Sequence, residues 1–537
     1  MTAMRTVSFA FLLGGWLALA AVPTTRAQQP QVDPELTRMV QDAVPDADGN
    51  LVLPLRTAPV GKEKDFERAK STRIRQVQTY LKSEEALSDA DQAIVKGWFY
   101  THEFRVLTQT SPKDLEQLPT LRFELFKQWI YPIKHNTNHK MMIDLTLGVM
   151  QQIVTNNFHP AVRYTAMLII GDLNEQEVVK VGGSANWRTP EPYSAALPFI
   201  IDRIENANSP DPVRVAALLS LLRHLEFEPH RQKESPIPAG TRTQLVNALL
   251  KVANAKTPPA KRTAEGHLWL RRRAVEGLGL ASVNTAQPEV VSAIDTILKD
   301  NTEPLQLRFA AALALGRTNL PVGFKVDVNE LARTLGTLAA TGIKTEFDRL
   351  DKMDKVEAEH REIYLGLTDA GVPGGAGPGV QRGAGEGGPG VQPGAVLAPE
   401  VDPKSYRLEP LRKKLRYELY CVQTGLGHVF EKAAPAVEGA APVRKGATNI
   451  AVTPAEKTAV KDILDVVNKV ATSIEKNKID YTLLKTEMKT GAKSLETTVA
   501  KFVPAAAAPA APMPGVAPMP GAPMPKPAAP VDDLLGK

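Results

Sequence analysis

The stretch PLQLRFAAALALGRT, residues 304–318, decides the fold class of this 537-residue chain. It is amphipathic with a helical period and rich in small residues. Three further stretches repeat its pattern when all are aligned on the arginine: AVRYTAMLIIG at 161–171, PVRVAALLSLL at 212–222 and LRRRAVEGLG at 270–279. One pattern that recurs within a chain predicts stacked copies of one structural unit.

Each copy places an apolar residue before its arginine, and these arginines are Arg163, Arg214, Arg271 and Arg308. Three residues later each copy has an alanine: Ala166, Ala217, Ala274 and Ala311. A small residue at mid-helix lets neighbouring helix backbones approach closely. Eight residues after the arginine, three copies have Gly171, Gly279 or Gly316, where we expect a left-handed helix cap, and the fourth has Leu222.

A second helical stretch precedes each copy, so the repeats are predicted to be helix pairs. The expected first helices span residues 139–155, 193–206, 242–255 and 288–299, and the second ones 160–173, 212–225, 268–280 and 304–317. One pair cannot bury its apolar faces alone. The sequence therefore predicts an all-α fold in which the pairs stack into an α-solenoid.

The pattern of an acidic or proline turn, apolar-Arg, x-x-Ala and Leu-Gly resembles the second helix of HEAT repeats. It is most similar to the bacterial HEAT-like type that also occurs in phycobilisome-lyase-like proteins. The resemblance implies a scaffold for protein–protein contacts and a structural role for the four arginines, each paired with an acidic group of the adjoining turn. Asp211 and Asp300 are the expected partners, whereas the turn Asn157-Phe158-His159 has no acid. No catalytic residue defines the repeat, so no lyase activity is implied.

The rest of the chain is predicted to flank these repeats with further helices and low-complexity segments. Glycine and proline dominate residues 370–402, and alanine and proline dominate residues 503–537, so both are expected to be disordered. The expected organisation is a signal peptide at 1–27, an extended leader at 28–62, a helical cap at 63–137, HEAT-like repeats at 138–320, helix at 321–369, a disordered insertion at 370–402, helix at 403–432, a linker at 433–453, a helical hairpin at 454–502 and a disordered tail at 503–537.

The first 27 residues read as a secretory signal. Arg5 precedes an apolar run at 7–22, and Thr25-Arg26-Ala27 places small residues at the −3 and −1 positions of a cleavage site. The run is shorter than the roughly 20 residues that span a bilayer. We therefore expect a mature chain from Gln28 in the periplasm or outside the cell, with an uncleaved anchor as the alternative. No later stretch predicts a transmembrane helix.

Composition excludes several classes of protein. Removing Arg5 and Arg26 with the signal takes the net charge from +6 to +4, and the charges are interspersed, which does not favour a nucleic-acid partner. Cys421 is the single cysteine, so the chain has no intrachain disulfide, no CxxCH haem attachment, no cysteine-rich zinc site and no iron–sulfur cluster. We expect Cys421 to be a buried apolar residue.

The search for chemistry finds only weak candidates, and we predict no catalytic residue, metal or cofactor. His135 and His139 have the spacing of a zinc pair, but turn-forming residues separate them and no HExxH glutamate is present. His102-Glu103 is either an acid/base pair or part of the core. The surrounding aromatics form either a binding groove or a bundle core: Trp98, Phe99, Tyr100, Phe104, Phe123, Phe126, Trp129 and Tyr131.

Two charged segments have alternative interpretations. The basic run Arg412, Lys413, Lys414 and Arg416 would meet an anionic polymer or lipid headgroups, or would form a solvated helix face. The segment Val531-Asp532-Asp533-Leu534-Leu535, at the end of the proline-rich stretch, is either a docking motif or a frayed end.

From these features we expect an exported, non-enzymatic scaffold that binds another protein through the solenoid surface. The alternative is a structural envelope component, tethered to cell-wall polymer or a membrane surface by its tail or basic helix. A third possibility is an enzyme with its site in the aromatic N-terminal bundle or in the insertion that carries Trp187. The sequence does not identify the partner protein.

Overall fold

A computed structural model describes residues 34–180, 187–230, 237–283, 287–321, 324–365, 405–427, 445–476 and 480–502. These residues are mostly helical, which confirms the all-α class, and they form two compact units divided between Ile170 and Gly171. The strands in the described ranges form three two-stranded antiparallel pairs. The predicted signal peptide, the glycine-rich insertion at 370–402 and the tail at 503–537 lie outside the described residues.

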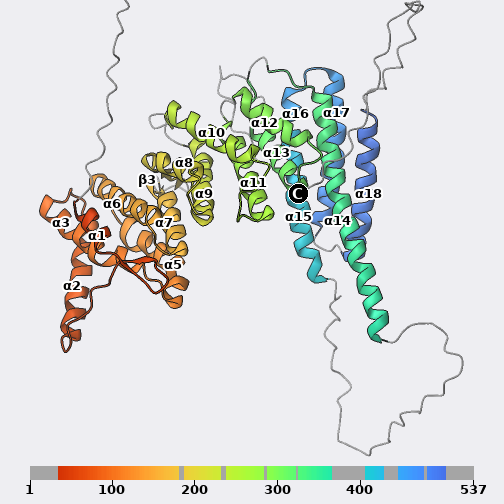
Figure 1. The fold of residues 1–537 in the computed structure, drawn as a ribbon. Helices are drawn as coiled ribbons and strands as arrows, with labels where there is room; N and C mark the ends of the chain where they lie inside the picture. The colour runs from red at the N-terminus through yellow and green to blue at the C-terminus, as the bar shows by residue number, and fades with distance from the viewer. Residues whose placement is uncertain are drawn as a thin grey trace, which may run out of the picture. The chain divides into compact units, whose positions relative to one another are not determined.

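The first unit consists of short helices around an aromatic core. Its elements are α1 (Pro34–Gln41), β1 (Val44–Pro45), β2 (Leu51–Val52), α2 (Glu63–Leu81), α3 (Asp89–Trp98), η1 (Phe99–Glu103), α4 (Phe104–Val106), α5 (Pro112–Glu124), η2 (Leu125–Ile130), α6 (Asn136–Thr155) and α7 (Pro160–Asp172), the last of which crosses into the second unit (Figure 1). Serine side chains cap α3 and α5, because Ser88 accepts the backbone N–H of Asp91 and Ser111 accepts that of Asp114.

The region expected as an extended leader is folded from residue 34 onward. Leu36 and Met39 are buried on one face of α1, which packs against α6, and Leu53 is fully buried just after β2. Prolines and polar residues surround these three apolar side chains. The composition therefore predicted an extended segment and not these short elements. Two π-helical segments, η1 and η2, directly follow α3 and α5, respectively.

The second unit continues with helices in pairs. After β3 (Asn174–Gln176), β4 (Val179–Lys180), β5 (Trp187–Arg188), β6 (Glu191–Pro192) and η3 (Ser194–Ala196) come α8 (Leu197–Glu205), α9 (Asp211–Phe227), η4 (Glu228–His230), α10 (Ala239–Asn254), α11 (Ala264–Ala281), α12 (Pro288–Lys299) and α13 (Leu305–Arg317). In each pair the two helices pack together: α8 on α9, α10 on α11, and α12 on α13. The second helices also pack in series, α9 on α11 and α11 on α13 (Figure 1).

The C-terminal part of this unit is a bundle of α14 (Val328–Leu365), α15 (Ser405–Leu426), α16 (Gly446–Ile450), α17 (Pro454–Glu475) and α18 (Tyr481–Ala500). α15 packs on α13 and so extends the series of second helices, while α14 contacts α15, α17 and α18. A capping box between Thr453 and Glu456 starts α17, and an apolar stripe of α17 is buried at Val460, Ile463, Val467 and Val470.

The recurring glycines have a different role from the one predicted. None of Gly171, Gly279 and Gly316 has a positive φ, so they are not left-handed caps. A Cβ added at Gly279 would lie 2.6 Å from the Cα of Ala314, and one at Gly316 would overlap the carbonyl oxygen of Thr424. Gly279 and Gly316 are needed because the backbones of successive second helices are in contact, whereas a Cβ at Gly171 would overlap the side chain of Ser220.

The copy in α9, which has Leu222 in place of this glycine, also packs against a glycine of the next second helix. A Cβ at Gly277 of α11 would lie 3.1 Å from Cδ2 of Leu222, so the leucine of α9 packs over a glycine of the next second helix. The recurring alanines are buried at mid-helix as expected, and Ala217, Ala274 and Ala311 are fully inaccessible to solvent.

Candidate functional site

The four recurring arginines share one backbone contact. Each donates its Nε–H to a carbonyl of the helix that precedes its own, at distances of 3.0, 3.2, 2.9 and 3.0 Å; the donor–acceptor pairs are Arg163–Val154, Arg214–Ile204, Arg271–Ala253 and Arg308–Leu298. Every acceptor is the second-last residue of its helix. Carbonyls at a helix C-terminus lack intrahelical donors and carry the negative end of the helix dipole. Each arginine therefore ties a second helix to the end of its first helix.

The acidic partners differ from copy to copy. Arg214 contacts Asp211 as expected, with 3.3 Å between Nη1 and Oδ1. Asp300, the expected partner of Arg308, instead accepts hydrogen bonds from Lys256 at 2.8 Å and from Thr302. Arg271 pairs with Glu303, an acid that the sequence pattern did not single out. The arginine-to-carbonyl contact is therefore the constant feature of the pattern, and the acid is the variable one.

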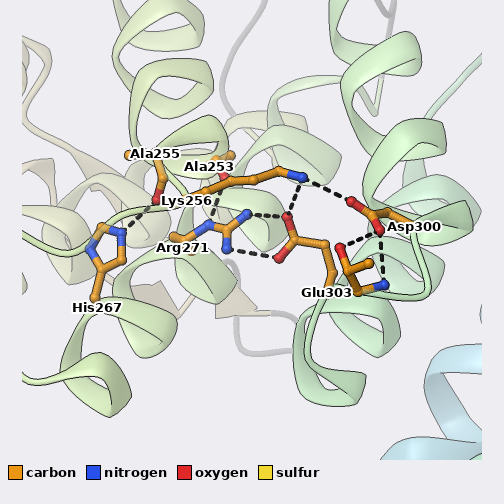
Figure 2. Close-up of polar contacts among 8 residues, drawn as sticks. Ala253, Ala255, Lys256, His267, Arg271, Asp300 and Glu303 are labelled. Carbon is orange, nitrogen blue, oxygen red and sulfur yellow. Dashed lines mark hydrogen bonds and ion pairs between the residues drawn. The ribbon is translucent and has the colours of Figure 1, made fainter. Parts of the chain in front are cut away.

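Arg271, Glu303, Lys256 and Asp300 form what we call the closed junction, between the α10/α11 and α12/α13 pairs (Figure 2). The guanidinium of Arg271 donates two hydrogen bonds of 2.8 Å to the two carboxylate oxygens of Glu303, and both side chains are 5% exposed. Lys256 lies 3.5 Å from the same carboxylate. The hydrogen bonds from Arg271 hold the pKa of Glu303 below its usual value. A cavity of about 370 Å³ lies beside this junction.

Asp211, Arg214, Arg262 and His267 form what we call the open junction, between the α8/α9 and α10/α11 pairs. Asp211, the first residue of α9, accepts 2.6 and 2.8 Å hydrogen bonds from Arg262, whose hydrogen bonding lowers the pKa of this carboxyl group. The side chain of Asp211 is nevertheless 44% exposed. His267 contacts Arg262 through Nδ1 and the carbonyl of Ala255, just past the end of α10, through Nε2.

A groove of about 550 Å³ opens at this junction. Its apolar lining comes from α8, α10 and α11 and the adjoining turns, and includes Ile204, Ala248, Val252, Pro259 and Leu270. Lys251 and Lys261 are exposed at the groove, and neither makes an ion pair with a described residue. The hydroxyl of Ser209 is buried in the lining without a hydrogen-bond partner in the described part of the chain. The groove thus presents apolar surface together with uncommitted polar and basic groups.

A second surface lies where α11 faces α15, and we call it the arginine–aromatic surface: Trp269, Arg272, Arg273 and Tyr417. Arg273 stacks over the ring of Trp269 at 5.4 Å, and Arg272 lies over the ring of Tyr417 at 5.9 Å. Glu276 connects two members of the set, since it accepts hydrogen bonds from Arg273 at 2.7 Å and from the Tyr417 hydroxyl at 2.9 Å. The residue Tyr417 itself is 37% exposed.

The N-terminal aromatics are mostly core. Phe99 and Phe104 are fully buried, and Phe99 meets Trp129 edge-on at 5.4 Å, whereas Phe123 and Tyr131 are exposed. The Trp98 indole N–H donates to Glu103 at 3.1 Å.

Burial raises the pKa of Glu103 to about 7 and lowers that of neighbouring His102. No hydrogen bond joins His102 to Glu103 within the described contacts of this unit. The two residues therefore do not form the hydrogen-bonded acid/base pair that their adjacency in the sequence suggested.

The other candidates from the sequence, His135, His139 and Cys421, lie at a helix N-terminus or in the core. His135 is the N-cap of α6, where Nδ1 accepts the backbone N–H of Thr137, and His139 is buried one turn later. The described residues contain no group of three or more His, Cys, Asp or Glu side chains that could hold a metal ion. Cys421 is buried as expected, and burial raises the pKa of its thiol to about 12.

The basic run of α15 is not a single solvated face. Arg412 donates to the carbonyls of Ile474 and Glu475 at 3.0 and 2.9 Å, and Lys414 pairs with Glu346. Ile474 is the second-last residue of α17, so Arg412 repeats the contact of the four arginines. The signal was the apolar-Arg dipeptide Leu411-Arg412 after a proline; it was missed because the helix that Arg412 caps follows α15 in the sequence.

Comparisons with protein-family models, curated proteins and solved structures give no match. Within the described ranges, no helix combines the length and apolar character needed to cross a membrane.

Proposed function

We propose that this chain is an exported, non-enzymatic scaffold that binds another protein across a HEAT-like array of helix pairs. The observation that carries this proposal is the arginine–aromatic surface. Tryptophan, tyrosine and arginine are the residues most enriched among the energetically important contacts of protein interfaces. Here they gather on two second helices, α11 and α15, that both pack on α13.

The geometry of this surface favours binding because its side chains are already ordered. Both guanidinium groups stack on rings, and Glu276 fixes Arg273 and Tyr417 by hydrogen bonds. Long side chains that are ordered before binding lose less conformational entropy on association. A partner with carboxylates and apolar groups would match the guanidinium groups and the two rings.

The tethered-component alternative receives less support from the basic helix. Arg412 and Lys414 make intramolecular contacts, and Arg416 lies 3.9 Å from Glu475, which leaves Lys413 as the most exposed of the four at 74%. An anionic polymer would therefore meet little uncommitted charge on α15. Tethering through the tail concerns residues outside the described ranges.

A capture experiment tests the scaffold. The mature chain from Gln28 is crosslinked in envelope extract, and captured proteins are quantified by mass spectrometry for the wild type, the double variant Trp269→Ala/Arg273→Ala, and the control Lys457→Glu/Lys461→Glu on α17. Circular dichroism verifies that each variant is folded. We expect one dominant partner whose capture falls at least tenfold in the double variant and is unchanged in the control. Equal capture by all three chains, or no partner at all, would overturn the proposal.

Export is tested separately by fractionating cells that express the full chain. We expect an exported product whose N-terminal residue is Gln28. An intact N-terminus in the cytoplasm would remove export from the proposal and leave protein binding to be judged by the capture experiment.

A further inference from the structure

The groove at the open junction has charged and polar groups that the fold does not use. Of the ionised side chains that line it, Glu205 and Asp211 are acidic and Arg214, Lys251, Lys261 and Arg262 are basic, a net charge of +2. Asp211 is already bonded to two guanidinium groups. Lys251, Lys261 and the buried hydroxyl of Ser209 are left without partners among the described residues.

These groups specify the chemistry of an occupant. The apolar lining favours aliphatic side chains, and the two lysines favour neighbouring carboxylates. A groove of about 550 Å³ lies in the range of pockets that enclose small ligands or a few peptide side chains. The matching ligand class is a short peptide with adjacent acidic and aliphatic residues.

The chain itself contains such a peptide, the segment Val531-Asp532-Asp533-Leu534-Leu535. We propose that residues 531–535 dock in this groove of their own chain. Asp532 and Asp533 would pair with Lys251 and Lys261, while Leu534 and Leu535 would cover the apolar lining. The groove is then closed by an internal ligand, which a partner with a similar acidic and aliphatic segment has to displace. This inference does not depend on the arginine–aromatic surface.

A long connecting chain leads from the described residues to this segment. The described residues end at Phe502, and 28 residues, 503–530, lead from there to the segment. A proline-rich chain of this length can reach as far as about 90 Å, at about 3.1 Å per residue in the polyproline conformation. A segment tethered to the same chain has an effective concentration on the order of millimolar, so docking with a Kd well below that value leaves the groove largely occupied.

Competition with a free peptide tests the proposal in the full mature chain. The binding of a fluorescent peptide of residues 527–537 is measured by anisotropy with the wild type and with Asp532→Asn/Asp533→Asn. In this variant the loss of both carboxylates weakens docking of the chain's own segment. We expect the Asn variant to bind the peptide about tenfold more tightly, because its groove is vacant. Adding Lys251→Glu/Lys261→Glu to this variant should abolish binding, whereas Lys457→Glu/Lys461→Glu should leave it unchanged.

Each result bears on the proposal. Equal peptide affinity for the groove and control lysine variants, or no binding at 1 mM peptide by the Asn variant, would overturn it. Carbodiimide crosslinking of the wild type, read by mass spectrometry, should join Asp532 or Asp533 to Lys251 or Lys261 with a yield independent of protein concentration. A yield that rises with concentration would instead show that the segment reaches a second copy, which contradicts docking within one chain.

Discussion

The closed and open junctions flank the same helix pair, α10/α11, and each contains an arginine of the recurring pattern. They differ in how their carboxylates are buried and hydrogen-bonded. Glu303 lies in the turn before α13 and is bound by both Nη atoms of Arg271, with both side chains 5% exposed. Asp211 begins α9, is shared by Arg214 and Arg262, and stays 44% exposed. The closed junction leaves a cavity of about 370 Å³ and the open one a groove of about 550 Å³.

This difference shows how one repeated contact serves two purposes. The Nε-to-carbonyl bond is the same in both pairs and fixes how the second helix meets the first. The partners of the remaining guanidinium nitrogens, the two Nη atoms, differ between Arg214 and Arg271. Where these nitrogens bind a buried acid of the next pair, the carboxylate compensates a guanidinium charge that is itself buried. Where the acid lies at the surface, the junction leaves a groove of about 550 Å³.

The largest predicted effect is the loss of the buried acid. Glu303→Ala leaves the Arg271 guanidinium buried without its carboxylate, which we expect to destabilise the second unit by about 3–5 kcal/mol. Hydrogen exchange of α11 and α13 measures the loss locally. Glu330→Ala, which removes an exposed ion pair with Lys299, is the control and should cost less than about 1 kcal/mol. Similar losses in both variants would refute the special status of the closed junction.

The second largest loss of stability is expected at the contact between the second helices α11 and α13. Gly279→Ala places a methyl group against the α13 backbone, and we expect a loss of about 1–3 kcal/mol. The control, Gly240→Ala in the first turn of α10, has no atom within 4 Å of its new Cβ and should be neutral or slightly stabilising. Urea unfolding followed by circular dichroism compares the two. A tolerated alanine at 279 would argue against direct backbone contact.

Acid should weaken both junctions. Hydrogen bonds to arginine lower the pKa values of Glu303 and Asp211 in the folded chain. Their stabilisation is therefore present above the unfolded pKa of each carboxyl and is lost as the pH falls through the folded value. Thermal unfolding between pH 6 and pH 3 should show a shallower decline in Glu303→Gln than in the wild type. Parallel curves would mean that this carboxyl does not titrate differently on unfolding.

The open junction should be more tolerant. Asp211→Asn keeps an oxygen that can accept a hydrogen bond from Arg262 and removes the charge of a side chain that is 44% exposed, so we expect a loss of about 1 kcal/mol or less. The same local hydrogen-exchange measurement, applied to α9 and α10, distinguishes it from Glu303→Ala. A loss as large as that of Glu303→Ala would erase the contrast between the junctions.

The smallest effect belongs to the groove lysines. Lys251→Glu/Lys261→Glu alters exposed side chains without described ion pairs, and stability should stay within about 0.5 kcal/mol. The midpoint of urea unfolding checks this. A large shift would mean that these lysines are structural and not available to a ligand.

Local sequence patterns predicted the helices well, because amphipathic periods and caps act within a few residues. The predicted first helix at 288–299 matches α12, and the predicted second helices differ from the observed ones by a few residues at their ends. The role of Gly279 could not be predicted from its own helix, since only the approach of α13 requires a glycine there.

The ion pairs of the two junctions were harder to predict from the sequence. Arg271 meets Glu303 across 32 residues, and Arg262 meets Asp211 across 51 residues. Such pairs depend on how the helix pairs stack, which no local pattern encodes. The sequence did single out Arg214 and Asp211, because both lie in the first turn of one helix.

The most direct test of the scaffold is hydrogen exchange of the mature chain with and without the partner that it captures. We predict that binding slows exchange in α11, α13 and α15, around Trp269, Arg273 and Tyr417, and leaves the first unit unchanged. Protection confined to α2–α5 of the first unit, with no change in the second helices, would contradict the claim that this surface binds protein.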